Sequence, residues 1–383
     1  MRKVCIIITT RGNYAKLKSI IKAIHDDDDL ELQLIMGGGA ILERYGNIAN
    51  KLSLEGIRIC RLIHFLIEGE IPVTMAKSAG VALGEFATAF DDLKPDVVIT
   101  IADRFECLPI AIAASYMNIP VAHIEGGEVS GSIDESVRHS ISKLSHLHFP
   151  ATKSAAERIK RLGEPDETIF NVGCTSLDIL NELDLNDKSV ILKATRNKGV
   201  GPSINIDDNY LVVIQHPVTT EYAKNLVHVN QTIKAIDQLK IKAFWLWPNM
   251  DAGSDGVSKG IRMYREKKSP DFVHFFKSLP IEEFGPLLYN SKCIVGNSSS
   301  GIREASFLGV PSVNIGTRQG GRERADNVID VDYDEKQIKD AICSQVSIGR
   351  FEPSYLYGDG RASQKVIETL KIFDFKIQKR ITY

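Results

Sequence analysis

The sequence lacks most of the features that would set it apart from an ordinary globular protein. Its six cysteines include no CxxC pair, so neither a disulfide framework nor a zinc site is indicated, and we expect reduced thiols. No apolar run approaches the roughly 20 residues that span a membrane. The apolar stretch that follows Lys3 is too short for a signal peptide. We therefore expect a cytoplasmic protein that does not associate with membranes.

An excess of charge of either sign is also missing. Lysine and arginine number 47 and aspartate and glutamate number 49, which gives a net charge of −2. A near-neutral chain gives no bulk electrostatic reason to expect nucleic acid as a partner. Hydrophobic residues make up 43% of the chain, which argues against disorder. Because 383 residues exceed what one hydrophobic core usually organises, we expect two domains.

Short apolar, β-branched runs alternate with longer amphipathic segments along both halves of the chain. Such alternation indicates right-handed βαβ crossovers and parallel sheets that are covered on both faces. The expected strands are Val4–Thr9, Glu31–Met36, Ile57–Ile63, Val97–Ile101, Val121–Ile124, Leu211–Gln215, Ala243–Trp247, Val273–Phe276, Cys293–Val295, Ser312–Ile315 and Val328–Val331. Among the expected helices are Tyr14–His25, Val73–Leu93, Cys107–Met117, Ile302–Leu308 and Ala362–Phe375.

The predicted fold class is α/β, with two doubly wound, Rossmann-like domains that face a cleft. The N-terminal domain is expected at residues 1–183 and a nucleotide-binding C-terminal domain at 184–365. A terminal helix is expected at 366–383, packing back on the N-terminal domain. In open α/β sheets, ligands bind beyond the carboxyl ends of the strands. The loops that follow the strands are therefore where the chemistry is expected.

Charged side chains follow two strands of the first half. Arg11 comes after the first strand at an expected helix start, where it can bind an anionic group. Its plainer interpretation is a solvent-exposed residue at the start of a helix. Asp103 and Arg104 follow the strand Val97–Ile101, and an N-cap with its neighbour is the plainer interpretation of that pair.

A denser block of ionisable residues lies at the end of the strand Val121–Ile124 and in the loop and expected helix that follow it. It contains His123, Glu125, Glu128, Asp134, Glu135, Arg138 and His139. The paired Gly126 and Gly127 permit close approach of the backbone to a ligand. Crowded carboxylates push one another's pKa values apart, which supplies an acid and a base near neutral pH. A metal site is the rival interpretation, and we rank it lower because no HxxxH-type spacing appears.

Two polar residues follow strands of the second half. His216 comes directly after Leu211–Gln215 and is expected at the ligand-binding edge, although a histidine that caps a turn is the alternative. Asn249 follows Ala243–Trp247 and is expected at the same edge.

The strongest phosphate signal comes after the strand Cys293–Val295. A strand leads there into glycine and small hydroxyl residues at an expected helix start, where free N–H groups can bind phosphate. The residues concerned are Gly296, Asn297, Ser298, Ser299, Ser300 and Gly301. A well-capped helix without a ligand is the alternative. Glu304 can accept two ribose hydroxyls or simply stabilise the first helical turn, and Arg318 follows the next strand.

Five segments together resemble the hydrolysing UDP-N-acetylglucosamine 2-epimerases. That family includes bacterial enzymes of sialic-acid pathways and the epimerase half of the animal bifunctional epimerase/kinase. The segments are Asp103-Arg104-Phe105, the runs His123–Gly131 and Gln215–Thr220, and the runs Gly296–Ser299 and Gly316–Gln319. The resemblance extends from Val4 to about Phe373, and its motifs are far more specific than a lone GxGxxG.

The resemblance implies a glycosyltransferase-B-like fold and a homodimer or homotetramer. It also implies that UDP-N-acetylglucosamine and water are converted into N-acetylmannosamine and UDP, with no NAD, no other cofactor and no catalytic metal. The nucleotide sugar and the UDP product are then the partners of the chain.

Residue roles follow from this implied reaction. Asp103, Glu125 and Asp134 are the candidates for proton transfer at carbon-2. His216, Arg11, Arg318 and the Asn297–Gly301 segment are expected to stabilise the departing diphosphate. The remaining candidates for substrate binding or orientation are Arg104, Glu128, Arg138, Asn249 and Glu304.

One departure from the family pattern affects the expected sugar. Relatives that use UDP-N-acetylglucosamine have a segment resembling Ser-Gly-Ser-His-Leu after the second strand, whereas this chain has Gly37-Gly38-Gly39-Ala40-Ile41. A UDP- or GDP-linked 2,4-diacetamido-6-deoxy sugar of the legionaminic-acid route is therefore an alternative substrate. A glycosyltransferase of the same fold and a non-catalytic nucleotide-sugar sensor are alternative functions, and fold alone does not separate them.

Overall fold

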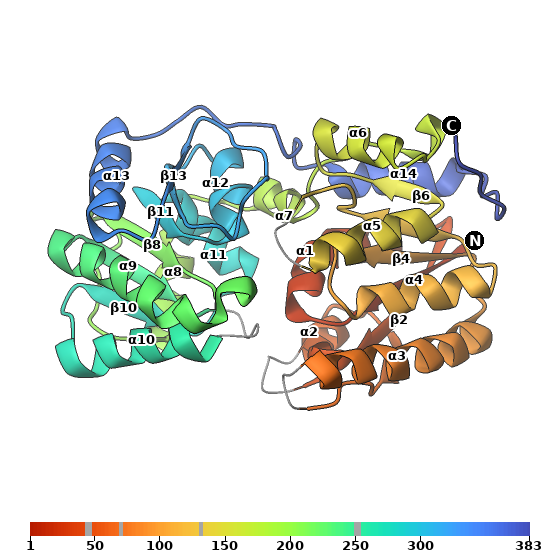
Figure 1. The fold of residues 1–383 in the computed structure, drawn as a ribbon, viewed down its shortest axis with the longest axis horizontal. Helices are drawn as coiled ribbons and strands as arrows, with labels where there is room; N and C mark the ends of the chain where they lie inside the picture. Colours follow the sequence, from red (N-terminus) through yellow and green to blue (C-terminus); the bar gives the residue numbers. More distant parts are fainter. Residues whose placement is uncertain (43–47, 69–71, 130–132, 249–253) are drawn as a thin grey trace. The chain divides into compact units, whose positions relative to one another are not determined.

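The structure, a computed structural model, describes residues 1–42, 48–68, 72–129, 133–248 and 254–383 (Figure 1). The chain forms two compact units. The N-terminal unit contains Met1–Val129, Ile133–Asp178 and Gly358–Tyr383, and the C-terminal unit contains Ile179–Tyr357. The domain boundaries expected from the sequence, after residues 183 and 365, lie a few residues beyond these two crossings.

The N-terminal unit is built on a six-stranded parallel sheet in the order β3-β2-β1-β4-β5-β6. This is the strand order of a doubly wound Rossmann-type sheet. The strands are β1 (Arg2–Ile8), β2 (Leu30–Gly37), β3 (Ile59–Ile63), β4 (Val97–Ile101), β5 (Val121–Ile124) and β6 (Leu147–Phe149). The order reverses between β1 and β4, which places the loops after these two strands at the ligand-binding position of such folds.

Helices cover both faces of this sheet, and its central strand β1 is accordingly apolar and buried from Val4 to Ile8. Val4 and Ile6 of β1 belong to a core on one face, while Cys5 and Ile7 belong to a core on the other. The helices are α1 (Arg11–His25), α2 (Ile48–Leu54), α3 (Pro72–Leu93), α4 (Cys107–Tyr116), α5 (Asp134–Leu144), α6 (Lys153–Arg161) and α14 (Ala362–Ile372), with short 3₁₀ turns at Gly38–Ile41 and Asp166–Thr168.

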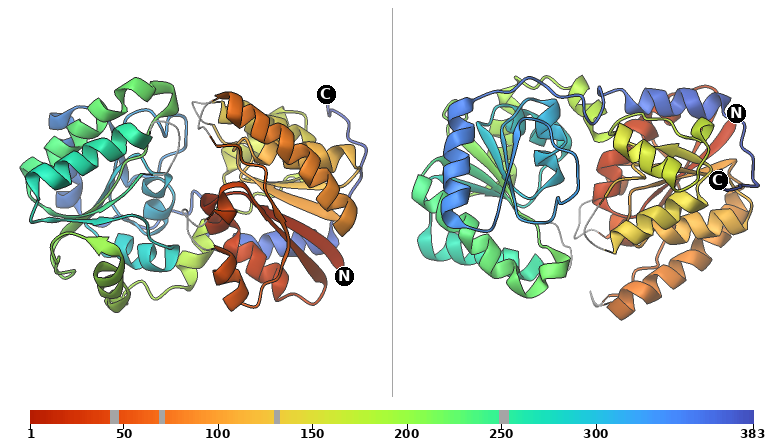
Figure 2. Two further views of the ribbon diagram at one scale, coloured as in Figure 1. Left: turned by 90° about the horizontal axis from the view of Figure 1, so that it is seen from below. Right: turned by 45° about the horizontal axis from the view of Figure 1, so that its top comes forward.

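The last helix of the chain completes the N-terminal unit. The blue α14 packs beside the red α1 (Figure 2), and Val366 and Leu370 belong to the same core as Leu17. The carboxylate of Asp178 accepts hydrogen bonds from the backbone N–H groups of Ala362 at 2.8 Å and Ser363 at 2.6 Å. Asp178, the last residue of the N-terminal unit before the chain enters the C-terminal unit, thereby caps the N-terminus of α14.

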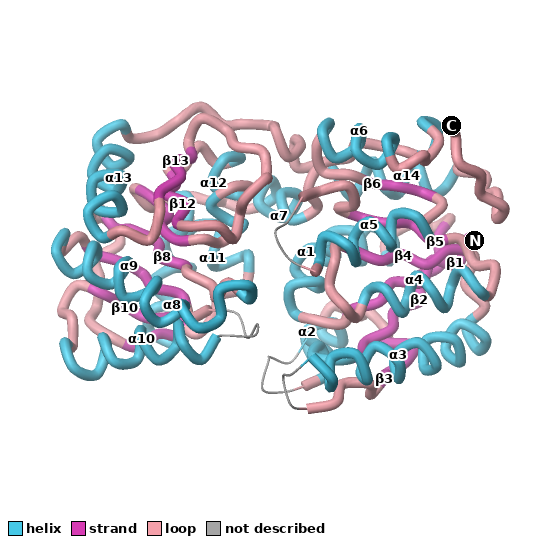
Figure 3. Tube along the Cα trace, viewed as in Figure 1, coloured by secondary structure: helices cyan, strands magenta, loops and turns pink. Residues whose placement is uncertain are grey.

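The C-terminal unit contains a seven-stranded sheet in the order β13-β12-β11-β8-β9-β10-β7, and Figure 3 draws its strands in magenta among the cyan helices. Its strands run parallel except β7, which is antiparallel to β10. The strands are β7 (Gly199–Val200), β8 (Tyr210–Ile214), β9 (Lys242–Leu246), β10 (Val273–Phe276), β11 (Cys293–Gly296), β12 (Ser312–Ile315) and β13 (Val328–Val331). The helices are α8 (Lys188–Lys198), α9 (Asn225–Leu239), α10 (Ser254–Lys268), α11 (Ile281–Tyr289), α12 (Glu304–Phe307) and α13 (Glu335–Ile348), and α7 (Ser176–Glu182) spans the boundary of the units.

One expected helix differs from the structure in a way that matters for the site. The sequence predicts a helix over Ile302–Leu308, whereas α12 covers only Glu304–Phe307 and a 3₁₀ turn, Ser299–Gly301, precedes it. The hydroxyl of Ser298 caps this turn by accepting from the N–H of Ser300 at 3.3 Å. In the described part of the chain, no helix combines the length and apolar character needed to cross a bilayer.

Candidate active site

Two adjacent strand ends carry the central carboxylates of the N-terminal unit. Ile101 of β4 pairs with Ile124 of β5, and the residues that follow them, Ala102 and Glu125, have φ angles of 60° and 59°. Non-glycine residues adopt this left-handed conformation at a cost, and such strain concentrates at functional sites. The two turns direct the chain into Asp103 on one strand and fix Glu125 itself on the other.

The carboxylate of Glu125 is buried and is held from two sides. Its side chain is 1% exposed and forms an ion pair with Lys16, which lies on α1. The thiol of Cys174 donates a hydrogen bond to the other carboxylate oxygen, Oε1, at 3.2 Å. A buried carboxylate is tolerated only with such partners, so Glu125 is a fixed, water-shielded acidic group.

Arg138 binds further acidic residues near the ends of β4 and β5. Its guanidinium is 1% exposed and forms an ion pair with Asp103. It also bonds Glu135 at 3.1 Å and the backbone carbonyl of Glu128 at 2.8 Å. The structure therefore brings Asp103, Glu128 and Glu135 together around one buried cation, which fixes the geometry of Asp103.

Asp134, the remaining predicted proton-transfer residue, lies in the first turn of α5 and is half-buried. Among the residues that the structure describes, no three His, Cys, Asp or Glu side chains are arranged to hold a metal ion.

His123 has a structural role, because its ring forms buried hydrogen bonds to neighbouring segments of the site. It is fully buried, its Nε2 lies 2.8 Å from the carbonyl oxygen of Ala102, and its Nδ1 lies 3.1 Å from the hydroxyl of Ser142. Because a carbonyl only accepts, Nε2 carries the proton and Nδ1 accepts from Ser142. Burial lowers the pKa of the His123 imidazole to about 3, so the ring is neutral at physiological pH. The other histidine of the block, His139, contacts Glu135 at 3.0 Å.

The two arginines predicted in the first half occupy different settings. Arg11 begins α1 and is partly buried, and this burial lowers the pKa of its guanidinium, although an arginine stays charged at any physiological pH. Arg104 is held by the buried Glu106 through Nε and Nη2 at 3.2 and 3.3 Å. Both are thus presented after the strands at the switch point of the sheet.

In the C-terminal unit, the structure brings together the predicted residues at the ends of β8 and β11. The carboxamide of Asn297 accepts from the backbone N–H of His216 at 2.6 Å and donates to the backbone carbonyl of His216 at 2.9 Å. The backbone carbonyl of Asn297 in turn accepts from Arg318 at 3.1 Å and from Gln319 at 2.9 Å. Asn297 therefore locks three loops into one arrangement.

The segment expected to bind phosphate is a short turn. Gly296 has a φ of 132°, and a Cβ there would lie 1.9 Å from the carbonyl oxygen of Ile214, so only glycine fits. The turn Ser299–Gly301 is a 3₁₀ turn that precedes the four-residue α12, so the long helix start predicted here from the sequence is wrong, while phosphate binding by the N–H groups and hydroxyls of the segment stays a prediction. Ser299 and Ser300 are partly exposed, and Glu304 is buried in α12.

Several functional contacts had no signal in the sequence. Lys16, Cys174 and Glu106 each contact a predicted site residue, and only the fold brings the first two to Glu125. Asn249, a predicted substrate-binding residue, lies outside the described residues.

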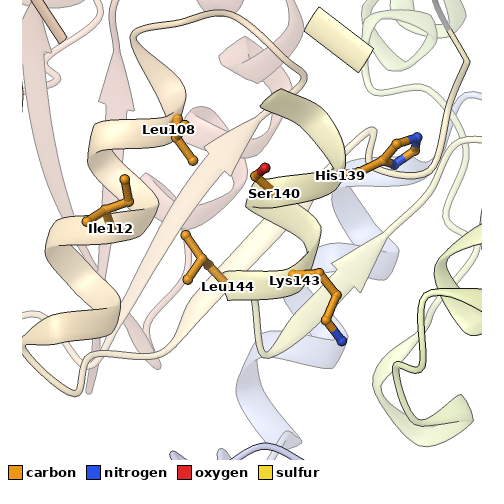
Figure 4. A pocket seen from close by; sticks show the side chains of 6 residues that line it. All are labelled: Leu108, Ile112, His139, Ser140, Lys143 and Leu144. Carbon is orange, nitrogen blue, oxygen red and sulfur yellow. The ribbon is translucent and has the colours of Figure 1, made fainter. Parts of the chain in front are cut away.

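A hollow on the N-terminal unit contains none of the predicted site residues (Figure 4). It lies between α4 and α5 and is lined by Leu108, Ile112, His139, Ser140, Lys143 and Leu144.

Comparison with known proteins decides the family. The family model described as UDP-N-acetylglucosamine 2-epimerase matches residues 22–371. The chain belongs to this family. The UDP-N,N'-diacetylbacillosamine 2-epimerase (hydrolyzing) of Legionella pneumophila subsp. pneumophila is 36% identical over 97% of this chain and 96% of its own. The UDP-N-acetylglucosamine 2-epimerase of Neisseria meningitidis serogroup B is 34% identical over 99% of this chain and 98% of its own.

Solved structures share the fold of this chain. The crystal structure of the UDP-GlcNAc 2-epimerase from Neisseria meningitidis bound to UDP-GlcNAc matches with a TM-score of 0.78 and 18% identity, covering 96% of this chain and 99% of that one. The family model and the two relatives confirm the 2-epimerase family predicted from the five sequence segments. The predicted glycosyltransferase-B-like class, with two parallel-sheet α/β units, is confirmed as well.

Proposed function

We propose that this chain is a hydrolysing 2-epimerase that converts UDP-N-acetylglucosamine and water into N-acetylmannosamine and UDP. The observation that carries the proposal is the pair of carboxylates at the ends of β4 and β5. Asp103 is fixed by Arg138, and Glu125 is fixed by Lys16 and Cys174. The name of the relative from Legionella pneumophila, which includes the hydrolysing activity, supports the same reaction type.

The order of bond changes follows from the acidity of the sugar. The carbon-2 proton is not next to a carbonyl group, so it is barely acidic until the bond between carbon-1 and the UDP oxygen breaks. The bonding electrons leave with UDP, and positive charge develops on the ring. A carboxylate then takes the carbon-2 proton, and the electrons of that C–H bond form the double bond of a glycal.

Water completes the reaction. Its oxygen bonds to carbon-1, and an acid delivers a proton to carbon-2 from the face opposite to the one that lost it. One proton of the attacking water restores the acid that protonated carbon-2, and the proton first taken from carbon-2 leaves its carboxylate for UDP or solvent, so both groups return to their starting protonation states. The net change is hydrolysis of the UDP–sugar bond with inversion at carbon-2.

The chain's own residues divide these tasks. Asp103, Glu125 and Asp134 are the proposed proton donors and acceptors at carbon-2. The diphosphate is proposed to be bound by Arg11, Arg318, His216 and the Asn297–Gly301 segment, with Arg104 as a further cation. Glu304 is proposed to accept the ribose hydroxyls, and Glu128, Arg138 and Asn249 complete the proposed binding groups.

A UDP- or GDP-linked 2,4-diacetamido-6-deoxy sugar is the second candidate substrate. The relatives from Legionella pneumophila and Campylobacter jejuni, 36% and 33% identical, are named for diacetylbacillosamine, and the Gly37–Ile41 segment departs from the pattern of enzymes that use UDP-N-acetylglucosamine. The apolar side chain of Ala40 is 3% exposed and belongs to the core. The Ala40 side chain therefore gives no contact that could select a sugar, and the histidine missing from this loop is what favours the second sugar.

A substrate panel in heavy water tests the proposal. Purified protein is incubated with UDP- and GDP-linked N-acetylglucosamine and with the corresponding diacetamido sugars, and products are identified by NMR. The expected result is release of the nucleoside diphosphate and a free 2-epimeric sugar that carries deuterium at carbon-2. Release of a 2-epimeric sugar still attached to UDP would show a non-hydrolysing enzyme, and transfer that depends on an added acceptor would show a glycosyltransferase.

Variants then test the assigned carboxylates. Glu125→Gln and Asp103→Asn are each expected to lower kcat by at least about 100-fold, the usual contribution of a general acid or base. Glu167→Gln, an exposed residue of the same unit, is the matched control and should retain wild-type turnover. Wild-type kcat in both site variants would remove Glu125 and Asp103 from the mechanism.

A further inference from the structure

The thiol of Cys174 is placed against the carboxylate of Glu125 by the fold of the N-terminal unit. Cys174 lies just before α7, and its Sγ is 3.2 Å from Glu125 Oε1. Both residues are 1% exposed. The preceding Gly173 is held in contact with Gly358, where a Cβ at Gly358 would lie 2.7 Å from the Gly173 Cα. The cysteine therefore has little freedom to move away from the carboxylate.

A second hydroxyl extends this contact. The Oγ of Ser176 lies 3.2 Å from the Sγ of Cys174, and Ser176 is also buried. Because the thiol donates its single proton to Glu125, the serine hydroxyl is the donor in the contact with sulfur. A donor that itself accepts a hydrogen bond becomes a stronger donor, so Ser176 strengthens the bond from Cys174 to Glu125.

The two sides of the carboxylate differ in kind. Lys16 supplies a full positive charge to Oε2, while Cys174 supplies an uncharged donor to Oε1. Both favour the ionised carboxylate over the protonated one, whereas burial opposes ionisation. The thiol also fixes which way the carboxylate plane faces, because a single point charge at Oε2 does not define that plane.

We propose that Cys174 is a positioning residue for Glu125, which orients its carboxylate and favours its ionised form during catalysis. The inference rests on the proposed function and adds to it a named group that acts through Glu125. It assigns no redox chemistry to the cysteine, because the thiol proton and the sulfur both remain in place throughout the reaction.

An infrared titration tests the contact without any need for turnover. The S–H stretching band of Cys174 is assigned by its absence in Cys174→Ala. As the pH falls and Glu125 becomes protonated, the carboxyl group is a weaker acceptor, and the band is expected to move to higher wavenumber. Glu125→Gln should fix the band at one position at every pH. A band that neither moves with pH nor responds to Glu125→Gln would overturn the proposal.

The matched control for this titration is another buried thiol. Cys293 is 0% exposed and its Sγ donates to the backbone carbonyl of Ile294 at 3.3 Å. Since a peptide carbonyl does not titrate, the Cys293 band should stay in place over the same pH range.

The pH dependence of kcat/KM tests the consequence for catalysis. Cys174→Ala removes the donor, so the limb that reports Glu125 should move upward by about half to one pH unit. Cys174→Ser keeps a donor and should give a limb at or below the wild-type position, while Cys293→Ala should leave the limb unchanged. Equal limbs in Cys174→Ala and the wild type, at matched thermal stability, would show that the thiol only fills space.

The two readouts separate the inference from the proposed function. If the wild type releases no nucleoside diphosphate from any nucleotide sugar, the proposed function fails, and the infrared titration still decides whether Cys174 senses Glu125. If turnover is found but neither substitution at Cys174 moves a limb, the positioning role fails while the proposed function stands.

Discussion

The side chain of His123 donates a hydrogen bond from Nε2 to the backbone carbonyl of Ala102, at 2.8 Å. This bond ties the end of β5 to the left-handed turn that ends β4, and Asp103 follows directly. A neutral imidazole thus acts as a brace between the two strand ends that carry the acidic residues.

The brace predicts how the stability of the protein depends on pH. Burial lowers the pKa of His123 to about 3 from its ordinary 6.5. Its contribution to stability is therefore complete above pH 6.5 and is lost as the pH falls from 6.5 through about 3. Over that window the wild-type free energy of unfolding should lose about 1.4 kcal/mol per pH unit through this residue. His123→Gln should show a shallower slope by that amount in urea unfolding at a series of pH values.

The control for this prediction is His25→Gln, at the exposed end of α1. It should keep the wild-type slope. Equal slopes for His123→Gln and the wild type would show that the buried imidazole does not take up a proton on unfolding.

The backbone conformation of the turn after Glu125 predicts that a single methyl group added at Gly127 strongly lowers the stability of the protein. Gly127 has a φ of 75°, and a Cβ there would lie 2.2 Å from the carbonyl oxygen of Ala155. Gly127→Ala should destabilise the protein by about 2–4 kcal/mol, because backbone strain and overpacking add together. Gly84→Ala, in the exposed middle of α3 with open space around it, should instead stabilise by about 1 kcal/mol. Chemical denaturation of both variants measures this contrast.

The hydrogen bonds between the Asn297 carboxamide and the backbone of His216 predict that a substitution of Asn297 lowers both the stability of the protein and its catalytic rate. Asn297→Ala removes the partner of the buried His216 N–H and should cost about 1–3 kcal/mol. Under the proposed function, kcat should fall as well, since His216 and Arg318 lose a shared support. Asn186→Ala, an exposed residue of the same unit, is the control for both measurements. An Asn297→Ala variant with the wild-type kcat and unfolding midpoint would contradict this supporting role of Asn297.

The contacts of Lys379 predict that a substitution there releases the C-terminal segment, residues 373–383, from the rest of the N-terminal unit. The ammonium of Lys379 bonds Glu164 at 2.7 Å and the backbone carbonyl of Lys143 at 2.8 Å. Lys379→Met should therefore detach this segment and expose it to limited proteolysis, while the exposed Lys376→Met should not. Mass spectrometry of early fragments distinguishes these outcomes, and identical cleavage of both variants would argue against an anchoring role.

The same anchor has its own pH window. Burial favours the protonated form of Glu164, but hydrogen bonds from His148, Lys143 and Lys379 outweigh it and lower the pKa of Glu164 to about 2. Its contribution to stability is thus present above pH 4.5 and is lost as the pH falls toward 2. The C-terminal segment of the wild type should become protease-sensitive in that acidic range, as judged with an acid-active protease. Glu164→Gln should already show the released segment at neutral pH.

The strands at the centre of each sheet could be predicted because their apolar runs are continuous and end at turn-forming residues. The predicted bounds of the inner strands β4, β5, β10 and β12 match the structure, and so do those of the edge strand β13. The three-residue β6 left too short a pattern to be found, and the helix expected at Ile302 was overestimated because serine and glycine there close a 3₁₀ turn instead.

The acidic block was predictable for a similar reason, since it follows β5 directly in the sequence. Its partners were not, because Lys16 and Cys174 are 109 and 49 positions away from Glu125. Only the chain path through α1 and the segment before α7 brings them to the carboxylate. No local pattern in the sequence carries that information.

The attachment of α14 to α1 means that the first 178 residues do not form a finished body. A ribosome producing this chain must deliver every residue of the C-terminal unit before the helix that covers α1 emerges. Until then, the apolar face of α1 that contains Leu17 stays exposed to solvent. Fragments cut at the boundary between the units should accordingly aggregate unless α14 is supplied, for example by circular permutation that joins it to the N-terminus.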